Sequence, residues 1–365
     1  MQKKYIILTS TMGLGTYVPA LQLRDYLNEN GIECDVDLFE SHFSDSLMSS
    51  YLKNKEAYHK SMKVAVVGHI MASKRLKSAL DDQSKNEILR SWEEAESFNF
   101  IIISGNWIEL INEYIQLYPE KVRAYIFHMD IGIAPSWKNF KNDANMYKEI
   151  FPFDKSGIHF IMENKTDKLS TTNLFPDKTF RVFVHGGGWG MGNYQEIVRS
   201  LKAKDDISVI SAAYKDSEAE DIGDYCIIDS EWKPWIKDET DQYQYPVMKI
   251  KRGCDSPIII DNQYSNGLYG IYSECSAIIS KPGGATLMDS LITGVPIVFI
   301  EPIAEHEKIN AAIWEELGLG ISFDKWEKSG FDKTVVYNLR ENLKKATYHA
   351  QGVGEYLKGL IKGDN

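Results

Sequence analysis

The stretch "SKPGGATLMDSLITGVPIVFIEPIAEHEKIN" (residues 280–310) decides the fold. A short apolar run ends at Ser280, and Gly283 and Gly284 then leave free backbone N–H groups at the start of a helical pattern. A second apolar run, "VPIVFIE", follows, and it ends in a loop rich in polar side chains. Strand, helix and strand in this order are typical of a parallel α/β sheet, whose ligands bind outside the carboxyl ends of the strands.

The same alternation of apolar runs and amphipathic helical patterns extends through the chain. It predicts parallel sheets that are covered on both faces. The series restarts near residue 180, after the polar segment 164–179, which is the best candidate for a linker. We therefore expect two Rossmann-like α/β domains that face a central cleft: residues 1–170, residues 180–345, and a C-terminal helix or tail over 346–365. The predicted strands are "KYIILTS", "CDVDLF", "FNFIIIS", "VRAYIFHMD", "IHFIMEN", "FRVFVHG", "ISVISAA", "YCIIDS", "SPIIIDN", "AIIS" and "VPIVFIE".

Length and composition exclude several classes of protein. The chain has 365 residues, which is enough for two domains, and a net charge of −11, which argues against binding to nucleic acid. Its four cysteines are scattered without a C-x-x-C motif, so we expect reduced thiols in a cytoplasmic protein. No stretch approaches the roughly 18 apolar residues of a membrane span. The apolar run at the N-terminus has only about four residues, too few for a signal peptide.

One segment is locally basic. Residues 53–77 carry several cations around the apolar run "VAVVGHIMA". A basic amphipathic helix can lie on an anionic membrane, which predicts peripheral contact at the inner face of the membrane. Of the two interpretations we favour the other one, an exposed, solvated helix face. The cations are Lys53, Lys55, Lys60, Lys63, Lys74, Arg75 and Lys77.

Two further glycine loops follow predicted strands. In "TSTMGLGTYVP" (9–19), Gly13 and Gly15 allow a ligand to approach the backbone, but the loop lacks the G-x-G-x-x-G pattern of dinucleotide sites. "VHGGGWGMGNY" (184–194) contains five glycines, whereas a closely packed strand–helix corner needs one or two. We interpret this excess as a loop whose backbone N–H groups hold a diphosphate.

Asp289 lies in the first turns of the helix that Gly284 opens. Alone, such a carboxylate is explained by the helix dipole. Together with two glycine loops in the same predicted domain, it favours a nucleoside diphosphate whose ribose hydroxyls are bound by Asp289.

Residues 280–320 resemble the nucleotide-sugar signature of the glycosyltransferase family that includes monogalactosyldiacylglycerol synthase and the N-acetylglucosaminyltransferase acting on lipid I. "YSNGLYGIYSECSAIIS" (264–280) resembles the helix and strand before that signature, and "GGGWG" falls where the family has its own glycine-rich loop. The resemblance covers most of residues 180–320, and over 1–165 it is only topological. The matching residues are Lys281, Gly283, Gly284, Thr286, Asp289, Gly294, Pro296, Glu307, Asn310 and Gly318.

The resemblance implies the GT-B fold and a metal-independent hexosyltransferase without a cofactor. A UDP-sugar would bind the C-terminal domain, and the acceptor would be a hydroxyl or amine of a small molecule or a lipid. Asp289 would hold the ribose, although the family more often has Glu there, and His306 stands where Gln is usual. Glu307 and Asn310 would contact sugar or ribose hydroxyls. The implied donor-binding residues are Gly187, Gly188, Trp189, Lys281, Gly283, Gly284, Ala285, Thr286, Asp289, His306, Glu307 and Asn310.

On the acceptor side we expect Gly13, Gly15 and Thr16. The family usually has a His at the place of Thr16, and a threonine cannot act as a base at neutral pH. "FHMDIGIAPSW" (127–137) resembles the family segment T-D-x-x-x-H-x-x-W without its His, which makes Asp130 the first candidate for the general base. His128 and His42 are further candidates.

Two alternatives keep the same donor site. A nucleotide-sugar hydrolase would use water as acceptor, and a non-catalytic partner subunit would bind the nucleotide sugar without turnover. The sugar, the acceptor, the oligomeric state and the choice between uridine and thymidine stay open at this point.

Overall fold

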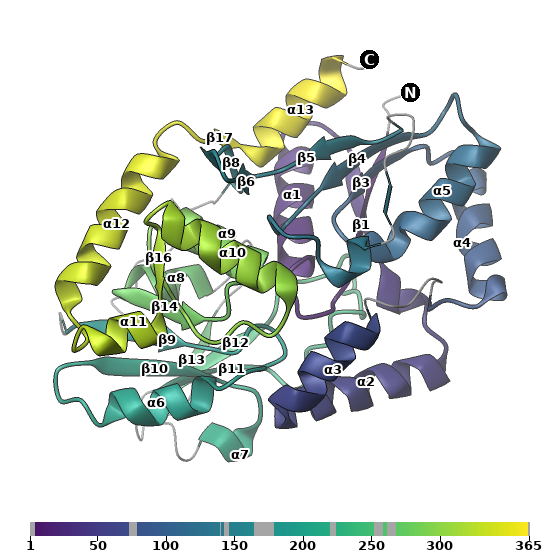
Figure 1. The fold of residues 1–365 in the computed structure, drawn as a ribbon. Coiled ribbons are helices and arrows are strands. Elements are labelled where there is room, and N and C mark those ends of the chain that lie inside the picture. Colours follow the sequence, from purple (N-terminus) through teal and green to yellow (C-terminus); the bar gives the residue numbers. More distant parts are fainter. Residues whose placement is uncertain are drawn as a thin grey trace.

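The computed structural model describes residues 4–72, 79–138, 140–141, 146–163, 179–219, 224–251, 258–260 and 268–363. Two sheets lie in two halves of the molecule (Figure 1). The expected linker 164–179 falls outside the described residues except for Thr179, so the domain boundaries stay a proposal. Lys74, Arg75, Lys77 and Cys254 also lie outside them.

The first sheet has five parallel strands in the order β2-β1-β3-β4-β5. Its central strands are buried on both faces, as their near-continuous apolar sequences predict. α1 covers one face with its buried Leu21, Leu23 and Leu27, while α4 and α5 cover the other. The bounds are β1 (Tyr5–Thr9), β2 (Cys34–Leu38), β3 (Asn99–Ile102), β4 (Arg123–Phe127), β5 (Lys148–Ile150), α1 (Tyr17–Glu29), α4 (Asp82–Glu94) and α5 (Ile108–Leu117).

The second sheet has eight strands in the order β13-β12-β11-β10-β9-β14-β15-β16. β12 runs antiparallel to both β11 and β13, so the expectation of parallel strands is wrong at this edge. The segment 229–247 returns the chain without a crossover helix, and β12 therefore enters the sheet from the opposite end. The strands are β9 (Arg181–Val184), β10 (Ser208–Ala213), β11 (Tyr225–Ile228), β12 (Met248–Lys251), β13 (Ile258–Ile260), β14 (Ala277–Ser280), β15 (Ile297–Phe299) and β16 (Gly320–Ser322).

Helices flank this second sheet. α9 follows β14 and ends at Gly294, which adopts the left-handed conformation that glycine favours at a helix C-terminus. α10 follows β15 and places Glu307 in its first turn. The helices are α6 (Tyr194–Lys202), α7 (Asp216–Ala219), α8 (Leu268–Ser273), α9 (Gly284–Thr293), α10 (Glu305–Glu316) and α11 (Phe323–Lys328).

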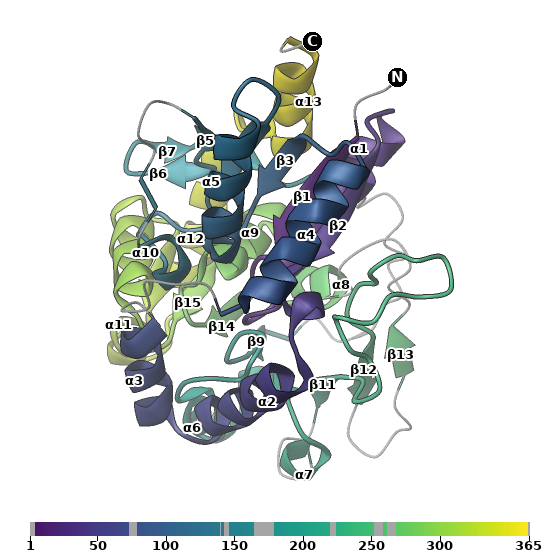
Figure 2. The same cartoon turned by 90° about the vertical axis from the view of Figure 1, so that its right-hand side faces the viewer.

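An arm of two helices, residues 45–72, reaches from the first half of the molecule to the second. α2 (Asp45–Lys60) and α3 (Met62–Ala72) break at Ser61, so the basic segment is two helices within the described residues. The arm packs its buried Tyr51 and Ala65 against Trp189, Met191 and Ile303. Figure 1 and Figure 2 both show α2 and α3 below the strands of the first sheet. The arm therefore joins the two halves over the glycine-rich loop.

The C-terminal segment returns to the first half. After α12 (Lys333–Thr347), β17 (Gln351–Gly352) pairs with β8 (Phe160–Ile161). α13 (Val353–Gly363) then packs on α1, where the Tyr26 hydroxyl donates to Glu355 at 2.8 Å. Both termini consequently lie at the same end of the molecule (Figure 1). No helix among the described residues is long and apolar enough to cross a membrane.

Candidate functional site

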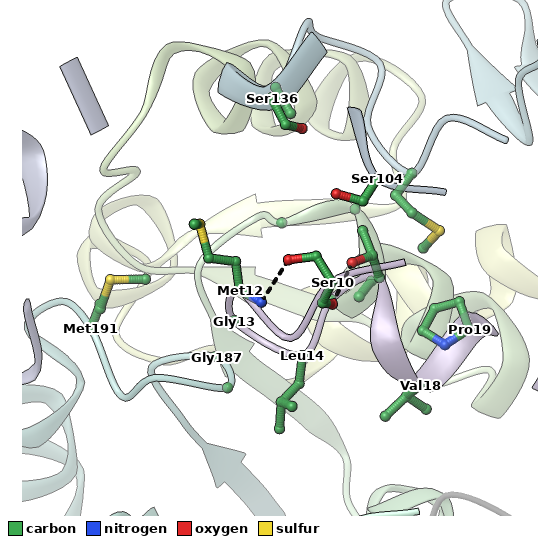
Figure 3. Close-up of a pocket in the computed structure, with 18 of the residues that line it drawn as sticks. Ser10, Met12, Gly13, Leu14, Val18, Pro19, Ser104, Ser136, Gly187 and Met191 are labelled. Carbon is green, nitrogen blue, oxygen red and sulfur yellow. Dashed lines mark hydrogen bonds between the residues drawn. The ribbon is translucent and has the colours of Figure 1, made fainter. Parts of the chain in front are cut away.

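A cavity of about 700 Å³ lies where the carboxyl ends of the two sheets meet. Loops that follow β1, β3 and β4 line it from the first half, and loops that follow β9, β14 and β15 line it from the second. In Figure 3 the loop from Ser10 to Leu14 lies beside Gly187 of the opposite half. The topology of two parallel sheets thus brings together loops that are far apart in sequence.

The two ends of the cavity differ in chemistry. The first half contributes an apolar patch, the apolar wall, formed by Phe39, Phe43 and Leu47 and bordered by serine and asparagine side chains. The second half contributes the start of α9, the buried Lys281 and the carboxylates of Asp289 and Glu307. One cavity therefore offers a polar wall and an apolar wall to the same ligand or pair of ligands.

The N-terminus of α9 holds a carboxylate from the opposite half. Asp130 Oδ1 accepts hydrogen bonds from the Gly284 backbone N–H at 2.9 Å and from Asn310 Nδ2 at 2.7 Å. A helix N-terminus favours an anion through its free N–H groups and its dipole. The start of α9 thus holds a carboxylate of the protein itself, and diphosphate binding at these glycines stays a prediction.

Asn310 forms hydrogen bonds that connect the two halves of the molecule. Its amide donates to Asp130 and to the carbonyl of Pro282 at 2.9 Å, and its Oδ1 accepts from the Ile131 backbone N–H at 3.0 Å. The side chain is fully buried. Both amide hydrogens of Asn310 are thus bonded inside the protein. The contact of Asn310 with a sugar stays a prediction, and it would require these hydrogen bonds to rearrange.

Glu307 forms a buried ion pair with Lys281, with 3.0 Å between Oε1 and Nζ. Its other oxygen accepts from the backbone N–H groups of Ile303 at 2.7 Å and Ala304 at 3.4 Å, which fixes the start of α10. Burial alone would raise the pKa of Glu307, but the charge of Lys281, the neighbouring His306 and these backbone bonds lower it to about 2. Glu307 is therefore ionised, and it holds the Lys281 ammonium at the cavity wall.

Asp289 lies on α9 and lines the cavity, as Tyr272 and Phe183 do. Burial raises the pKa of its carboxyl to about 7, and a hydrogen bond from Tyr269 opposes that rise. Tyr269 in turn accepts from Gln22 of α1 at 2.9 Å. A partly desolvated carboxylate of this kind gains from any ligand that donates O–H groups to it.

Asp289 predicts a specific pH dependence of stability. Its folded pKa lies above the unfolded value of about 3.9, so the folded state retains a proton that the unfolded state releases as the pH rises. The stability of the wild type should therefore fall relative to Asp289→Asn between about pH 4 and pH 7 and stay level above. Urea unfolding of both proteins across this range measures the difference, and parallel pH curves would contradict the assignment.

Local geometry explains the glycines of the loop 185–193. Gly187, Gly190 and Gly192 have φ values of 72°, 62° and 101°, a region that other residues rarely adopt. A side chain on Gly188 would overlap the carbonyl oxygen of Gly13. Gly187 and Gly188 line the cavity, so the glycine-rich loop both packs against the first half and faces the site.

Trp189 is not among the described residues that line the cavity. It packs at 5.4 Å from the Tyr51 ring and 5.9 Å from the Tyr58 ring, both on the arm. Its position indicates a contact between the two halves of the molecule, and its predicted role in donor binding stays a prediction.

On the acceptor side, Gly13, Gly15 and Thr16 line the cavity. The Thr16 hydroxyl donates to the Ser10 carbonyl at 2.8 Å, which closes the loop. Glu40, which the sequence did not single out, is buried beneath the loop and accepts from Ser10 Oγ at 2.6 Å and from the Thr11 N–H at 2.8 Å. This carboxylate fixes the shape of the loop rather than facing a ligand.

The candidate bases differ in position. Asp130 lines the cavity. His128 pairs with Glu149 at 2.8 Å and stacks on Phe151, and His42 pairs with Asp37 at 2.7 Å. Neither histidine is among the described residues that line the cavity.

Two histidines that sequence reasoning missed, His69 and His185, do line the cavity. His185 accepts from the Gly187 N–H at 3.1 Å and contacts the Tyr272 hydroxyl at 3.3 Å. No local pattern distinguishes either one, because only the tertiary fold brings them to the cavity. Among the described residues, no cluster of three or more His, Cys, Asp and Glu side chains forms a metal site.

No family model matches the chain. The curated proteins that match it are named as diacylglycerol glucosyltransferases. The chain is 25% identical over 159 residues to the processive diacylglycerol beta-glucosyltransferase of Bacillus licheniformis, covering 42% of this chain and 34% of the relative. It is 20% identical over 179 residues to the enzyme of that name from Bacillus subtilis, covering 47% of this chain and 40% of the relative. The chain thus spans well under half the length of these relatives. They confirm the resemblance to the suspected glycosyltransferase family.

Solved structures match over the whole chain. SsfS6, a glycosyltransferase of Streptomyces sp. SF2575 complexed with thymidine diphosphate, superposes with a TM-score of 0.57 at 12% identity over 99% of each chain. VinC in complex with dTDP gives 0.56 at 10% identity over 98% of each chain. MurG of Acinetobacter baumannii gives 0.54 at 14% identity over 99% of each chain. The chain therefore has the GT-B fold, as expected: two Rossmann-like domains that face a central cleft.

Proposed function

We propose that this chain is a glycosyltransferase that moves a hexose from a nucleoside diphosphate sugar to the hydroxyl of a lipid acceptor. One observation carries the proposal: a single cavity joins a polar wall with an anion-binding helix start to an apolar wall from the opposite domain. A donor with a diphosphate and an acceptor with a hydrocarbon part would each find a matching surface, with the reacting atoms between them.

At the polar wall, the α9 N-terminus would bind the diphosphate. The first-turn N–H groups of Ala285 and Thr286 lack intrahelical acceptors, as in any helix, and Lys281 adds a buried positive charge. Asp289, at the same end of the cavity, would accept both ribose hydroxyls. These groups also stabilise the negative charge that develops on the leaving diphosphate, so the chemistry we propose rests on preorganised dipoles and charge.

The donor is proposed to be a UDP-sugar, following the family resemblance. Thymidine diphosphate, which is bound in structures of two fold relatives, is the competing donor class. Only a comparison of nucleotides separates the two.

At the apolar wall, we propose a diacylglycerol-type acceptor. The curated relatives that match are named for diacylglycerol, and the apolar wall suits acyl chains. α3 exposes an apolar face next to the basic residues of the arm: Val64, Val67, Ile70 and Met71 are 44%, 54%, 51% and 64% exposed. This face would contact the membrane that supplies the lipid, with Lys53, Lys60 and Lys63 near the anionic head groups.

Turnover of UDP-glucose with dioleoylglycerol in mixed micelles tests the function. We expect glucosyl-diacylglycerol and UDP in equal amounts. Release of free glucose without glycolipid would instead indicate a hydrolase. Binding of UDP without any turnover of the panel UDP-glucose, UDP-galactose and UDP-N-acetylglucosamine would indicate a non-catalytic subunit.

A further inference from the structure

The carboxylate of Asp289 is bonded to a tyrosine on the neighbouring helix α8. Asp289 lines the cavity and is only partly accessible. Tyr269 is 1% exposed, and its hydroxyl donates a hydrogen bond to Asp289. The two oxygens of a carboxylate offer about four acceptor sites, so this bond leaves sites for the hydroxyls of a ribose. Tyr269 itself is not among the described residues that line the cavity, so it can act on a ligand only through Asp289.

The opposite half of the molecule orients the Tyr269 hydroxyl. Gln22 on α1 donates from Nε2 to the hydroxyl oxygen of Tyr269 at 2.9 Å. A tyrosine hydroxyl has a single hydrogen. Because Gln22 supplies the hydrogen of the first bond, the hydrogen of Tyr269 remains for the bond to Asp289. The three side chains therefore form a directed hydrogen-bond network, the Gln22–Tyr269–Asp289 network, that crosses from one domain to the other.

Further contacts hold α1 against the second half. Arg24 donates to the backbone carbonyl of Tyr243 at 2.8 Å, and the Tyr245 hydroxyl donates to Asp25 at 2.9 Å. Arg24, Tyr243 and Tyr245 are all buried. α1 also begins directly after the acceptor-side loop. The position of Gln22 thus depends on how the first domain docks on the second.

We propose that Tyr269 is a positioning residue of the ribose site, which keeps Asp289 ready to accept ribose hydroxyls, and that Gln22 orients it from the opposite domain. This inference rests on the proposed function, because it takes Asp289 as the contact of the donor ribose. It adds a dependence of donor binding on the docking of α1.

Electrostatics give the network a measurable effect. Burial favours the neutral form of Asp289 and raises its pKa to about 7, whereas the hydrogen bond from Tyr269 favours the ionised form. Tyr272 on α8 also faces Asp289, and burial raises the pKa of Tyr272 well above its usual value. The Tyr272 hydroxyl lies 3.3 Å from His185 Nε2, and burial lowers the pKa of His185 to about 3. Both neighbours therefore stay neutral between about pH 6 and pH 9, where Asp289 titrates.

The first test follows the Asp289 carboxyl without any ligand. Carboxyl-carbon NMR of labelled protein, assigned with Asp289→Asn, should give a titration midpoint near 7 in the wild type. In Tyr269→Phe the midpoint should be higher, because the ionised carboxylate loses its hydrogen bond. The matched control is Tyr245→Phe, which removes a buried hydroxyl of the same half that is bonded to α1. Its midpoint should equal that of the wild type.

UDP binding at two pH values gives the functional readout. At about pH 6, Tyr269→Phe should raise the Kd of UDP by about 10–100-fold, the change that corresponds to one hydrogen bond to a charged group. At about pH 9, where Asp289 is ionised in both proteins, the increase should be less than about threefold. Tyr245→Phe should stay within about threefold of the wild type at both pH values. The titration of UDP itself is common to all proteins and cancels in the ratio of their Kd values.

Gln22→Glu tests the direction of the network. A carboxylate has no hydrogen to donate, so it would accept the hydrogen of Tyr269 in place of Asp289. We expect Gln22→Glu to raise the Kd of UDP about tenfold at about pH 6. Gln22→Met leaves the hydroxyl able to reach Asp289 and should stay within about threefold. In the Tyr269→Phe background, Gln22→Glu should add less than about threefold, because no hydroxyl remains to be redirected.

Three results would overturn the inference. The first is an unchanged titration midpoint of Asp289 in Tyr269→Phe. The second is a rise in Kd that is equal at both pH values or equal in Tyr245→Phe, which would make Tyr269 a merely structural contact. The third is a full effect of Gln22→Glu in the Tyr269→Phe background, which would indicate direct charge repulsion.

Failure of the proposed function gives a different pattern. Wild-type protein that binds neither UDP nor TDP would refute that function and, with it, the role of Tyr269 at a ribose. The titration of Asp289 in Tyr269→Phe would still move upward in that case, because the hydrogen bond does not depend on a ligand.

Discussion

Replacing Glu307 with alanine is expected to destabilise the protein by about 3–5 kcal/mol, because it leaves a buried charge without its partner. Lys281 and Glu307 are both almost fully buried and 3.0 Å apart. The substitution also removes the acceptor of the Ile303 N–H at the start of α10. Urea unfolding at pH 7 measures the loss.

Glu305→Ala is the matched control. Glu305 lies in the same first turn of α10, but its side chain is 78% exposed and pairs with the exposed Lys308. Its removal should change stability by less than about 1 kcal/mol. Adding Lys281→Met to Glu307→Ala should recover part of the stability, since the unpaired charge is then gone. If Glu307→Ala loses no more stability than Glu305→Ala, the ion pair between Lys281 and Glu307 does not form in solution.

Gly284→Ala is expected to force the two domains apart at the site. A side chain at this position would overlap the backbone carbonyl oxygen of Met129, and the nearest atom of Asp130 would lie 3.0 Å from it. Backbone cannot rotate away as a side chain can, so we expect a loss of about 1–3 kcal/mol. Turnover should fall about 10²-fold, because displacing the reacting groups by about 1 Å has effects of that order.

Gly283→Ala is the control for this substitution. Gly283 is the adjacent residue, its φ of −77° suits any amino acid, and a side chain there meets no atom within 4 Å. The stability of Gly283→Ala should stay near the wild-type value. Equal effects of the two substitutions would contradict a close contact between α9 and the loop after β4.

The sequence predicts the strands of the two sheets well because each strand is marked by a pattern within its own few residues. Runs such as "FNFII" and "AIIS" are buried on both sides, and helical patterns lie between them, so each βαβ unit can be recognised within about 30 residues. The donor-side prediction has the same origin, since Lys281, Gly284 and Asp289 lie within ten positions of one another and all line the cavity.

The rest of the site depends on contacts that no local pattern encodes. Asp130 and Asn310 are 180 positions apart, and their hydrogen bond exists only because the two domains meet. His69 lies in an apolar run that fits a surface helix or a membrane contact, yet the arm carries it to the opposite domain. For the same reason the sequence could not show that Trp189 packs on the arm.

The glycine-rich loop illustrates a different limit. Five glycines indicate a loop with unusual backbone geometry, but the cause can be a ligand, a positive φ or a close backbone contact. Here positive φ values explain Gly187, Gly190 and Gly192, and contact with Gly13 explains Gly188. Composition alone cannot separate these causes.

The central claim is that the α9 start and Asp289 bind a nucleoside diphosphate, and thermal unfolding with UDP, TDP, GDP, CMP and NAD tests it most directly. At about one hundred times its dissociation constant, a ligand adds about 2.7 kcal/mol, which gives a clear rise in Tm. We expect UDP or TDP to raise the Tm of the wild type. The control is Asp324→Ala, at a residue in the first turn of α11, and its Tm should rise equally. The Tm of Asp289→Ala should not rise. A rise only with NAD, no rise with any nucleoside diphosphate, or an equal rise in Asp289→Ala would contradict the account.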